Sequence, residues 1–463
     1  MSAINNHPLL LLHEIEPLLP DNASHIRDRI VSSIYQHAEE ISSQVVSNEN
    51  TWRNSLEFKL DNILTSRWCG FPIMILLLTL ILWITISGAN YPSQLLALGL
   101  FKLEGYLLHL MTAAAAPAWL TGVLILGMYR SLAWVVSVML PPMAIFFPLF
   151  TLLEDLGYLP RVAFNMDNLF RRAGAHGKQC LTMCMGFGCN AAGVTSCRII
   201  DSPRERLIAI LTNTFSVCNG RFPTLIALAT IFMGTMFSRA YSSIVAALVV
   251  ASLIMIGIFT SLLVSSLLSR TLLRGIASFF VLELPPFRKP QLGQILIRSL
   301  LDRTLFVLWR AVVIAAPAGA LTWILANSWI GDSTIFAYMA AFLDPLGKIM
   351  GMDGIILIAF LLGLPANEIV LPILIMGYLS AGHILELDSL NALGKLLLDH
   401  GWTWITALCV MLFSLLHFPC GTTIYTIFKE TGSMRWTLLA TLLPLGLGIL
   451  VTIIVSQTAQ LLL

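Results

Sequence analysis

The sequence has 463 residues, enough for roughly three soluble domains of about 150 residues each, but its composition excludes that organisation. Hydrophobic residues make up 57% of the chain and charged residues 11%, whereas soluble proteins have about 45–50% and about 25%. The chain therefore cannot cover a water-exposed surface of this size, and we expect an all-α polytopic membrane protein. A net charge of +2 gives no sign of nucleic-acid binding, and eight Cys are too few for a disulfide scaffold.

The first 66 residues are polar and lack the apolar core of a signal peptide. Apolar residues recur there at helical spacing, namely Ile26, Ile30, Ile34, Ala38 and Ile41. This spacing predicts one amphipathic helix within a polar cytoplasmic helical extension at 1–66. Its apolar stripe needs a partner, which would be the transmembrane body, a neighbouring subunit or another protein.

Apolar stretches with at most one charged residue follow from residue 68 onward. A bilayer core of about 30 Å needs about 20 such residues for one helical span, and some of the longer stretches have room for hairpins. We therefore expect roughly eight to ten transmembrane or re-entrant helices. The stretches are 68–101, 103–129, 131–153, 207–238, 240–269, 311–331, 354–385, 401–428 and 436–463.

Basic residues gather in three regions, at 53–67, 161–206 and 270–310. Short loops rich in Lys and Arg stay on the cytoplasmic side of a membrane, so we place all three regions there. The segment from Asp332 to Asp353 carries mostly acidic charges, and we place it outside. These assignments leave the N-terminus in the cytoplasm.

The string Gly186-Phe-Gly-Cys-Asn190 is the first of four that interrupt the apolar pattern. Gly186 and Gly188, beside the thiol of Cys189 and the amide of Asn190, are typical of a helix that opens and exposes backbone carbonyls. The alternative is a close contact between two helices through small residues, with Cys189 as filler. The residues alone leave both interpretations open.

The second string is Cys218-Asn-Gly-Arg-Phe-Pro223. Arg221 is the only charged residue between Leu207 and Ser238, and Pro223 removes a backbone donor close to it. A buried Arg221 would hold an unwound segment in place by donating to freed carbonyls or by pairing with a carboxylate. The alternative is that its side chain extends to the membrane surface.

The third string is Gly363-Leu-Pro-Ala-Asn-Glu-Ile-Val-Leu-Pro372, in which Asn367 precedes Glu368. Glu368 is the only charged residue between Gly354 and Leu385. Irregular backbone at this depth is tolerated where it lines a cavity or is buried in protein. Glu368 therefore either attracts cations or forms a structural ion pair with Arg221.

The fourth string, His417-Phe-Pro-Cys-Gly421, adds an imidazole and the thiol of Cys420, although a lone His is more often packed than ligating. Secondary transporters expose backbone and side-chain groups to substrate at such breaks. Sulfur, imidazole and oxygen together suit a divalent first-row metal such as Fe(II), Zn(II) or Mn(II). The candidate metal ligands are Cys189, Cys218, Cys420, Glu368, Asn190, Asn367 and His417. The candidate gating or structural residues are Arg221, Pro223, Gly186, Gly188, Glu154 and Asp155, of which the last two form either a cytoplasmic entrance or a structural cap.

At these strings the chain resembles the membrane domain of the ferrous iron transport protein B family, over about residues 52–455. Further strings in the same order carry the resemblance: Leu153-Glu-Asp-Leu-Gly-Tyr158, Arg161-Val-Ala-Phe-Asn-Met-Asp167, His176-Gly-Lys178, Ser202-Pro-Arg-Glu-Arg206, Glu283-Leu-Pro-Pro286, Pro419-Cys420 and Lys429-Glu-Thr-Gly-Ser433.

The resemblance implies a first span and following segment at 67–118, then two gate-type membrane regions at 119–270 and 305–463. Between the gate regions it implies a basic cytoplasmic loop with an amphipathic helix at 271–304. It further implies a bacterial cytoplasmic membrane as the location and a path for iron near three thiols, those of Cys189, Cys218 and Cys420.

The chain also departs from the family pattern. Members usually begin with a GTPase domain, but the phosphate-binding string G-x-x-x-x-G-K-[S/T] occurs nowhere in this chain. Residues 21–66 resemble the end of the helical connector that follows that domain. The Lys that the family places before its intramembrane Glu is Asn367 here, the small residues that flank Cys218 are altered, and His417 replaces a hydroxyl-bearing residue. These differences bear on which metal is moved more than on metal transport itself.

We therefore expect a divalent-metal permease, most simply for Fe(II), that is not an enzyme and holds no cofactor. Its expected partners are the lipid bilayer, a separately encoded GTPase that docks on residues 1–66 and the basic loops, and further copies of the chain. One alternative is an organic-solute carrier of nucleoside type, for which four aromatic side chains are available, although each is more simply an interface anchor: Trp119, Trp134, Trp309 and Trp323. Another is a non-transporting membrane paralogue that recruits a partner.

Overall fold

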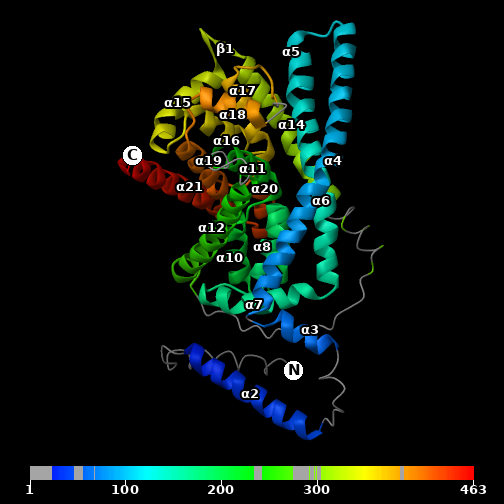
Figure 1. Ribbon diagram of the computed structural model, residues 1–463, viewed down its shortest axis with the longest axis vertical. Helices are drawn as coiled ribbons and strands as arrows, with labels where there is room; N and C mark the ends of the chain where they lie inside the picture. Colours follow the sequence, from blue (N-terminus) through cyan, green and yellow to red (C-terminus); the bar gives the residue numbers. More distant parts are fainter. Residues whose placement is uncertain are drawn as a thin grey trace, which may run out of the picture. The chain divides into compact units, whose positions relative to one another are not determined.

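Figure 1 shows the structure, a computed structural model of the chain. It describes residues 23–45, 56–66, 68–233, 242–274, 304–385 and 390–462, together with the single residues 291, 293, 297 and 299. Internal contacts divide the chain into two units, Met1–Ile63 and Leu64–Leu463. Most of the basic loop expected at 271–304, with its amphipathic helix, lies outside the described residues.

The first unit contains the helix α2 (Ala23–Val45), and α3 (Leu56–Leu64) begins in it and ends at its boundary. Along α2 the side chains of Ile30, Ile34 and Ile41 are all more than half exposed. Their spacing of four and seven residues places them on one face of the helix. At these three positions the apolar stripe expected from the sequence is therefore present and exposed.

A long helical hairpin opens the second unit. Its first arm is α4 (Gly70–Ala113), and its second arm runs through α5 (Ala118–Thr121), the π-helical segment η2 (Gly122–Tyr129) and α6 (Arg130–Asp155) (Figure 1). At about 1.5 Å per residue, α4 is about twice as long as a bilayer core is thick. The arms pack against each other and also make polar contacts: the hydroxyl of Tyr129 donates to the carbonyl of Leu100 at 2.9 Å, and Arg130 Nε lies 3.3 Å from the buried Glu104 carboxylate.

Short and broken helices follow the hairpin. In chain order they are α7 (Tyr158–Arg172), α8 (Gln179–Gly188), α9 (Asn190–Ser196), η3 (Cys197–Ile199), α10 (Pro203–Thr212), η4 (Asn213–Phe215), η5 (Asn219–Arg221), α11 (Phe222–Leu228) and η6 (Ala229–Met233), and the long α12 (Ser242–Arg270) closes this part. Their repeated interruption fits the polar and Gly- or Pro-containing strings that the sequence places between apolar stretches.

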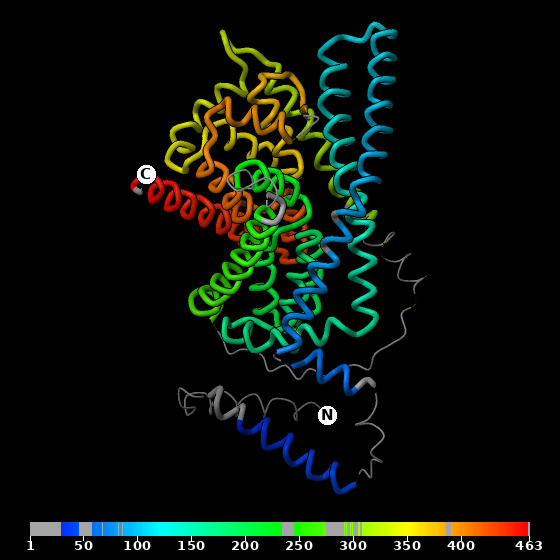
Figure 2. Tube along the Cα trace, viewed as in Figure 1, coloured from blue at the N-terminus to red at the C-terminus, as the bar shows by residue number. Residues whose placement is uncertain are grey.

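The remaining part has the same character. It comprises α14 (Phe306–Asn327), the two-residue strands β1 (Trp329–Ile330) and β2 (Ser333–Thr334), α15 (Ile335–Ile349), α16 (Gly354–Leu362), η8 (Asn367–Ile369), α17 (Val370–Tyr378), α18 (Leu390–Asp399), α19 (Trp404–Leu416), α20 (Gly421–Thr431) and α21 (Met434–Leu462). The strands pair antiparallel with Trp329 opposite Thr334. Helix α9 packs on α20 and α11 on α19, so the green and the orange-to-red segments of Figure 2 are interleaved.

Seven helices in the described residues are long and apolar enough to cross a membrane, or eight if α15 and α16, which meet at 112°, form one bent span. The all-α polytopic prediction is confirmed, and the lower end of the expected eight to ten segments is reached when α15 and α16 count as one span. The two spans that contain breaks, Pro203–Met233 and Trp404–Thr431, are each 72% buried, against about 20% for α4, α12, α14 and α21. The broken helices therefore form the protein-enclosed centre of the second unit.

Candidate functional site

Each of the four strings singled out in the sequence is a helix break with one extended residue before the next helix. Cys189 (φ −155°, ψ 125°) separates α8 from α9, and Ala366 (φ −151°, ψ 122°) precedes η8. Cys218 (φ −79°, ψ 161°) precedes η5, and Cys420 (φ −63°, ψ 158°) precedes α20. An extended residue ahead of a helix leaves the first backbone amides of that helix without intrahelical partners.

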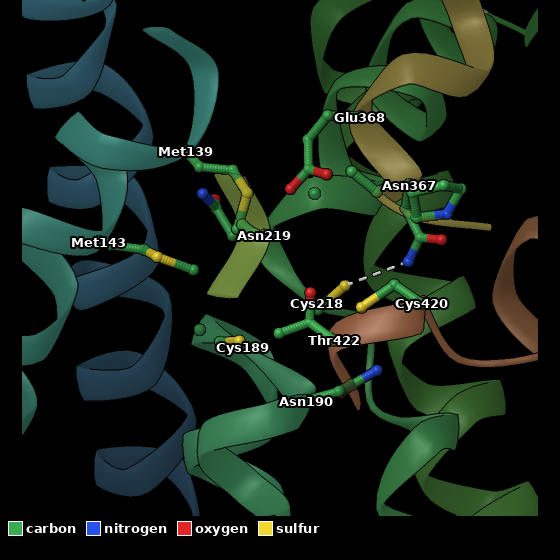
Figure 3. A pocket seen from close by; sticks show the side chains of 15 residues that line it. Met139, Met143, Cys189, Asn190, Cys218, Asn219, Asn367, Glu368, Cys420 and Thr422 are labelled. Atoms are coloured by element: carbon green, nitrogen blue, oxygen red, sulfur yellow. Dashed lines mark hydrogen bonds between the residues drawn. The ribbon is translucent and has the colours of Figure 1, made fainter. Parts of the chain in front are cut away.

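The four breaks meet at one cavity of about 30 Å³ (Figure 3). This is room for one or two water molecules or one small ion without its hydration shell. Six of the seven candidate ligands line the cavity: Cys189, Asn190, Cys218, Asn367, Glu368 and Cys420. Two segments of the chain contribute these residues, one with the breaks at Cys189 and Cys218 and one with the breaks at Ala366 and Cys420; we call them the two broken regions. Their packing brings residues more than 200 positions apart in the chain to one point.

The Glu368 side chain enters the cavity without a basic partner. Across the described residues no Lys, Arg or His pairs with it, and its carboxylate is held only by its own backbone amide. Gly220 makes this position available, because a Cβ there would overlap Glu368 Oε1. On the other side of the break, Trp134 Nε1 donates to the Glu368 carbonyl at 3.3 Å and ties the segment to α6.

The thiols and amides of the cavity are only lightly engaged. Asn367 Nδ2 lies 3.8 Å from Cys218 Sγ, and Cys420 Sγ lies 3.2 Å from the hydroxyl of Thr423. The amide nitrogen of Asn190 donates to the carbonyl of Gly186 at 3.1 Å. Over the described ranges, no three His, Cys, Asp or Glu side chains are arranged to hold a metal ion. The cavity therefore offers scattered soft and oxygen donors, not a closed ligand set.

Arg221 pairs with carbonyls, not with Glu368. It is 1% exposed, and its Nη1 donates to Thr214 O at 3.1 Å and to Leu415 O at 3.0 Å. Its Nη2 lies 3.5 Å from the carbonyls of His417 and Phe418. A guanidinium has five donors in a fixed plane, which suits several backbone acceptors at once. Arg221 thus joins the break of one broken region to the break of the other.

The local structure explains why Pro occurs at position 223 and Gly at positions 186 and 188. Pro223 is the second residue of α11, where its missing amide hydrogen has no intrahelical partner to lose. A Cβ at Gly188 would overlap the Phe146 ring of α6, and a Cβ at Gly186 would meet Asn213 Oδ1 at 3.0 Å. These residues allow close approach of neighbouring elements around the cavity.

Besides Arg221, Pro223 and Gly186, three further candidate residues do not line the cavity. His417 is 1% exposed, its Nδ1 lies 2.9 Å from Ser414 O, and its ring packs against three Phe rings, so the structure separates it from the cavity ligands. Glu154 and Asp155 lie at the end of α6, away from the cavity, where Asp155 Oδ2 accepts a hydrogen bond from the backbone amide of Gln291 at 3.1 Å.

The sequence analysis missed part of the cavity wall. Met139 and Met143 from α6, Asn219 and Gly220 from the second break, and Thr422 from α20 all line it. The available signal was the pair Pro141-Pro142 between the two methionines, because prolines inside a helix leave carbonyls without donors.

Ion pairs at the surface also join distant segments. Arg198 donates through Nε and Nη2 to the two oxygens of Glu430 at 2.8 and 2.7 Å, which connects η3 to α20. Lys178 Nζ donates to Asp201 Oδ2 at 2.9 Å, and this hydrogen bond lowers the pKa of the Asp201 carboxyl. The Arg198–Glu430 pair connects the two regions that meet at the cavity, whereas the Lys178–Asp201 pair lies within the first of them.

Two family profiles match the chain. The Gate family, described as "Nucleoside recognition", matches residues 136–233 and 308–434, which contain all four breaks. The family described as "Ferrous iron transport protein B C terminus" matches residues 250–302. No solved structure matches.

Curated relatives align with nearly the whole chain. The Fe(2+) transporter FeoB of Staphylococcus aureus (strain COL) is 26% identical over 99% of this chain and 69% of its own length. The Fe(2+) transporter FeoB of Methanocaldococcus jannaschii is 25% identical over 94% of this chain and 63% of its own length. In Porphyromonas gingivalis a fusion of Fe(2+) transport protein A with the Fe(2+) transporter FeoB is 25% identical over 88% of this chain and 53% of its own length. The chain spans between about half and seven tenths of these relatives, and it belongs to the ferrous iron transport protein B family, whose gate-containing membrane part it carries.

Proposed function

We propose that this chain moves a divalent metal ion, Fe(II), across the membrane through the cavity between its two broken regions. The observation that carries the proposal is Glu368, a carboxylate in the protein-enclosed centre that faces three thiols and has no basic partner among the described residues. An unpaired acid at membrane depth is costly unless a cation or a proton accompanies it.

The donor types favour a transition metal. Thiols with amide and carboxylate oxygens suit Fe(II) or Zn(II), whereas Ca²⁺ and Mg²⁺ prefer sites made of oxygen alone. A cavity of about 30 Å³ admits an ion that has lost most of its water. The absence of a ready ligand set in the described residues fits transport, because an ion held by a closed set of ligands leaves slowly.

A nucleoside substrate fits the cavity poorly, although the matched Gate profile bears the description "Nucleoside recognition". Pockets that enclose organic ligands measure about 300–1,000 Å³, roughly ten times the volume found between the breaks. Of the four tryptophans considered for ring binding, none lines the cavity.

Regulation and location follow from the family. In this proposal a separately encoded G protein regulates the chain by contacting residues 1–66 and the basic loops. The Porphyromonas gingivalis relative is a fusion of Fe(2+) transport protein A with the transporter, which supports a protein of that type as a second partner. We place the protein in a bacterial cytoplasmic membrane with its N-terminus in the cytoplasm, on the strength of the Lys and Arg distribution.

Uptake of radiolabelled Fe(II) into proteoliposomes under anaerobic conditions tests the proposal. We expect uptake by the wild-type chain and its loss in the triple variant Cys189→Ser, Cys218→Ser, Glu368→Gln. The control is Cys409→Ser, because Cys409 is fully buried in α19 and does not line the cavity. Triple-variant uptake equal to that of the wild type would overturn the proposal, and metal-independent uptake of a labelled nucleoside would favour the organic-solute alternative.

A further inference from the structure

One wall of the cavity comes from α6, outside the four breaks. Met139 and Met143 lie four residues apart on this helix, which puts both side chains on the same face. They are 9% and 3% exposed, and both line the cavity opposite Cys189 and Glu368. Figure 3 shows the two side chains extending from α6 toward the space where the thiols gather.

Both methionines belong to the hydrophobic core, and both also border the cavity. A buried methionine ordinarily fills irregular gaps in a core, but these two border empty space. Met143 also lines a second, smaller cavity beside Thr85 and Phe146, and with Gly188 and Asn219 it borders both spaces. A flexible, unbranched side chain at that point can move aside for an ion without disturbing the helix that carries it.

We propose that Met139 and Met143 form a thioether wall that favours soft divalent ions over hard ones at the transport cavity. This inference rests on the proposed function and adds to it the residues that set metal preference. Thioether sulfur is a soft, neutral ligand that binds soft metals better than hard, oxygen-preferring ions such as Mn²⁺. A thiol must lose a proton to become a strong ligand, whereas a thioether has none to lose, so its contribution is independent of pH.

Substitution by leucine removes the sulfur and keeps nearly the same volume, which cores usually tolerate. We would reconstitute the full chain as wild type, as Met139→Leu, as Met143→Leu and as the double variant, and measure uptake of Cd(II) and of Mn(II) in separate vesicles. The control is Met411→Leu, because Met411 is fully buried in α19 and does not line the cavity. Size-exclusion profiles in detergent identify any variant that has lost its fold, and the single variants then carry the test.

We expect the ratio of Cd(II) to Mn(II) uptake to fall about tenfold in the double variant, equivalent to roughly 1.4 kcal/mol, with smaller falls in the single variants and none in Met411→Leu. A folded double variant with the wild-type ratio would overturn this inference and leave the proposed function standing. Absence of any metal uptake by the wild-type chain would overturn both.

Discussion

The first breaks of the two broken regions, at Cys189 and at Ala366, have similar backbone conformations but carry different side chains. Gly186 to Asn190 and Gly363 to Asn367 have the same Gly-to-Asn spacing, and the residue before each Asn has nearly the same extended conformation. That residue is Cys189 in one break and Ala366 in the other. The residue after the Asn is Ala191 in one and Glu368 in the other. One break therefore supplies the thiol and its counterpart supplies the acid.

The second breaks are alike in conformation and in chemistry. Cys218 and Cys420 are both extended, and each directly precedes a helix. Arg221 follows the first of these and has no basic counterpart after the second, where Gly421 is followed by threonines. The single Arg serves both regions, because it donates to carbonyls of each. Neither broken region alone therefore contains the candidate metal site, and the cavity forms only where the two regions pack together.

The largest expected effect comes from removing the acid that only one break carries. Glu368→Gln keeps the shape of the side chain and removes the negative charge that offsets an entering cation. We expect Fe(II) uptake to fall about 100-fold, equivalent to roughly 2.7 kcal/mol. Asp399→Asn, an exposed position outside the cavity, is the control. Uptake by Glu368→Gln within twofold of the wild-type value would show that the Glu368 carboxylate is not needed for transport.

The next effect concerns the side chain that joins the two regions. Arg221→Lys keeps the charge but replaces a planar fork with a single ammonium, which cannot reach carbonyls on both sides. We expect the free energy of unfolding to fall by about 2 kcal/mol, since hydrogen bonds from charged groups are each worth about 1.5–3 kcal/mol. Unfolding in mixed micelles measures it, with Arg274→Lys, an exposed residue, as control. Equal stability of Arg221→Lys and wild type would show that the bridge contributes nothing.

A smaller effect is expected where one region makes space for the other. Gly220→Ala adds a methyl group that would overlap Glu368 Oε1, so the carboxylate must turn away from its position in the cavity. We expect Fe(II) uptake to fall about tenfold, the effect of roughly 1.4 kcal/mol. Gly446→Ala provides a matched control, because no atom lies within 4 Å of a Cβ at that helical glycine. Equal Fe(II) uptake by Gly220→Ala and Gly446→Ala would show that the close contact between Gly220 and Glu368 does not matter for transport.

The smallest effect is expected at the surface pair. Arg198 is 65% exposed at its side chain, although its partner Glu430 is only 9% exposed. Exposed ion pairs contribute about 0–1 kcal/mol, so Arg198→Ala should leave Fe(II) uptake unchanged and lower stability by less than about 1 kcal/mol. The same unfolding assay measures it. A tenfold loss of uptake would mean that this contact, and not the cavity, controls how the two regions meet.

The positions of the breaks were predictable from the sequence, because Gly, Pro and lone polar residues within apolar stretches act locally on the backbone. Which side chains face the cavity was not predictable, because a break interrupts the helical period that would relate one residue to the next. His417 illustrates this, since it lies three residues from Cys420 yet turns into a cluster of Phe rings. Met139 was missed because the uncharged stretch 131–153 has the composition of an ordinary span, although Pro141 and Pro142 interrupt its donors.

The central claim is that a transported ion contacts sulfur supplied by both broken regions. Iron K-edge X-ray absorption of the reconstituted chain loaded with Fe(II) tests this contact directly. The account predicts sulfur neighbours around iron in the wild type and fewer of them in the variant Cys189→Ser, Cys218→Ser, Cys420→Ser, which keeps only the methionine sulfurs of the cavity. A spectrum with oxygen and nitrogen neighbours alone, unchanged between the two proteins, would contradict it.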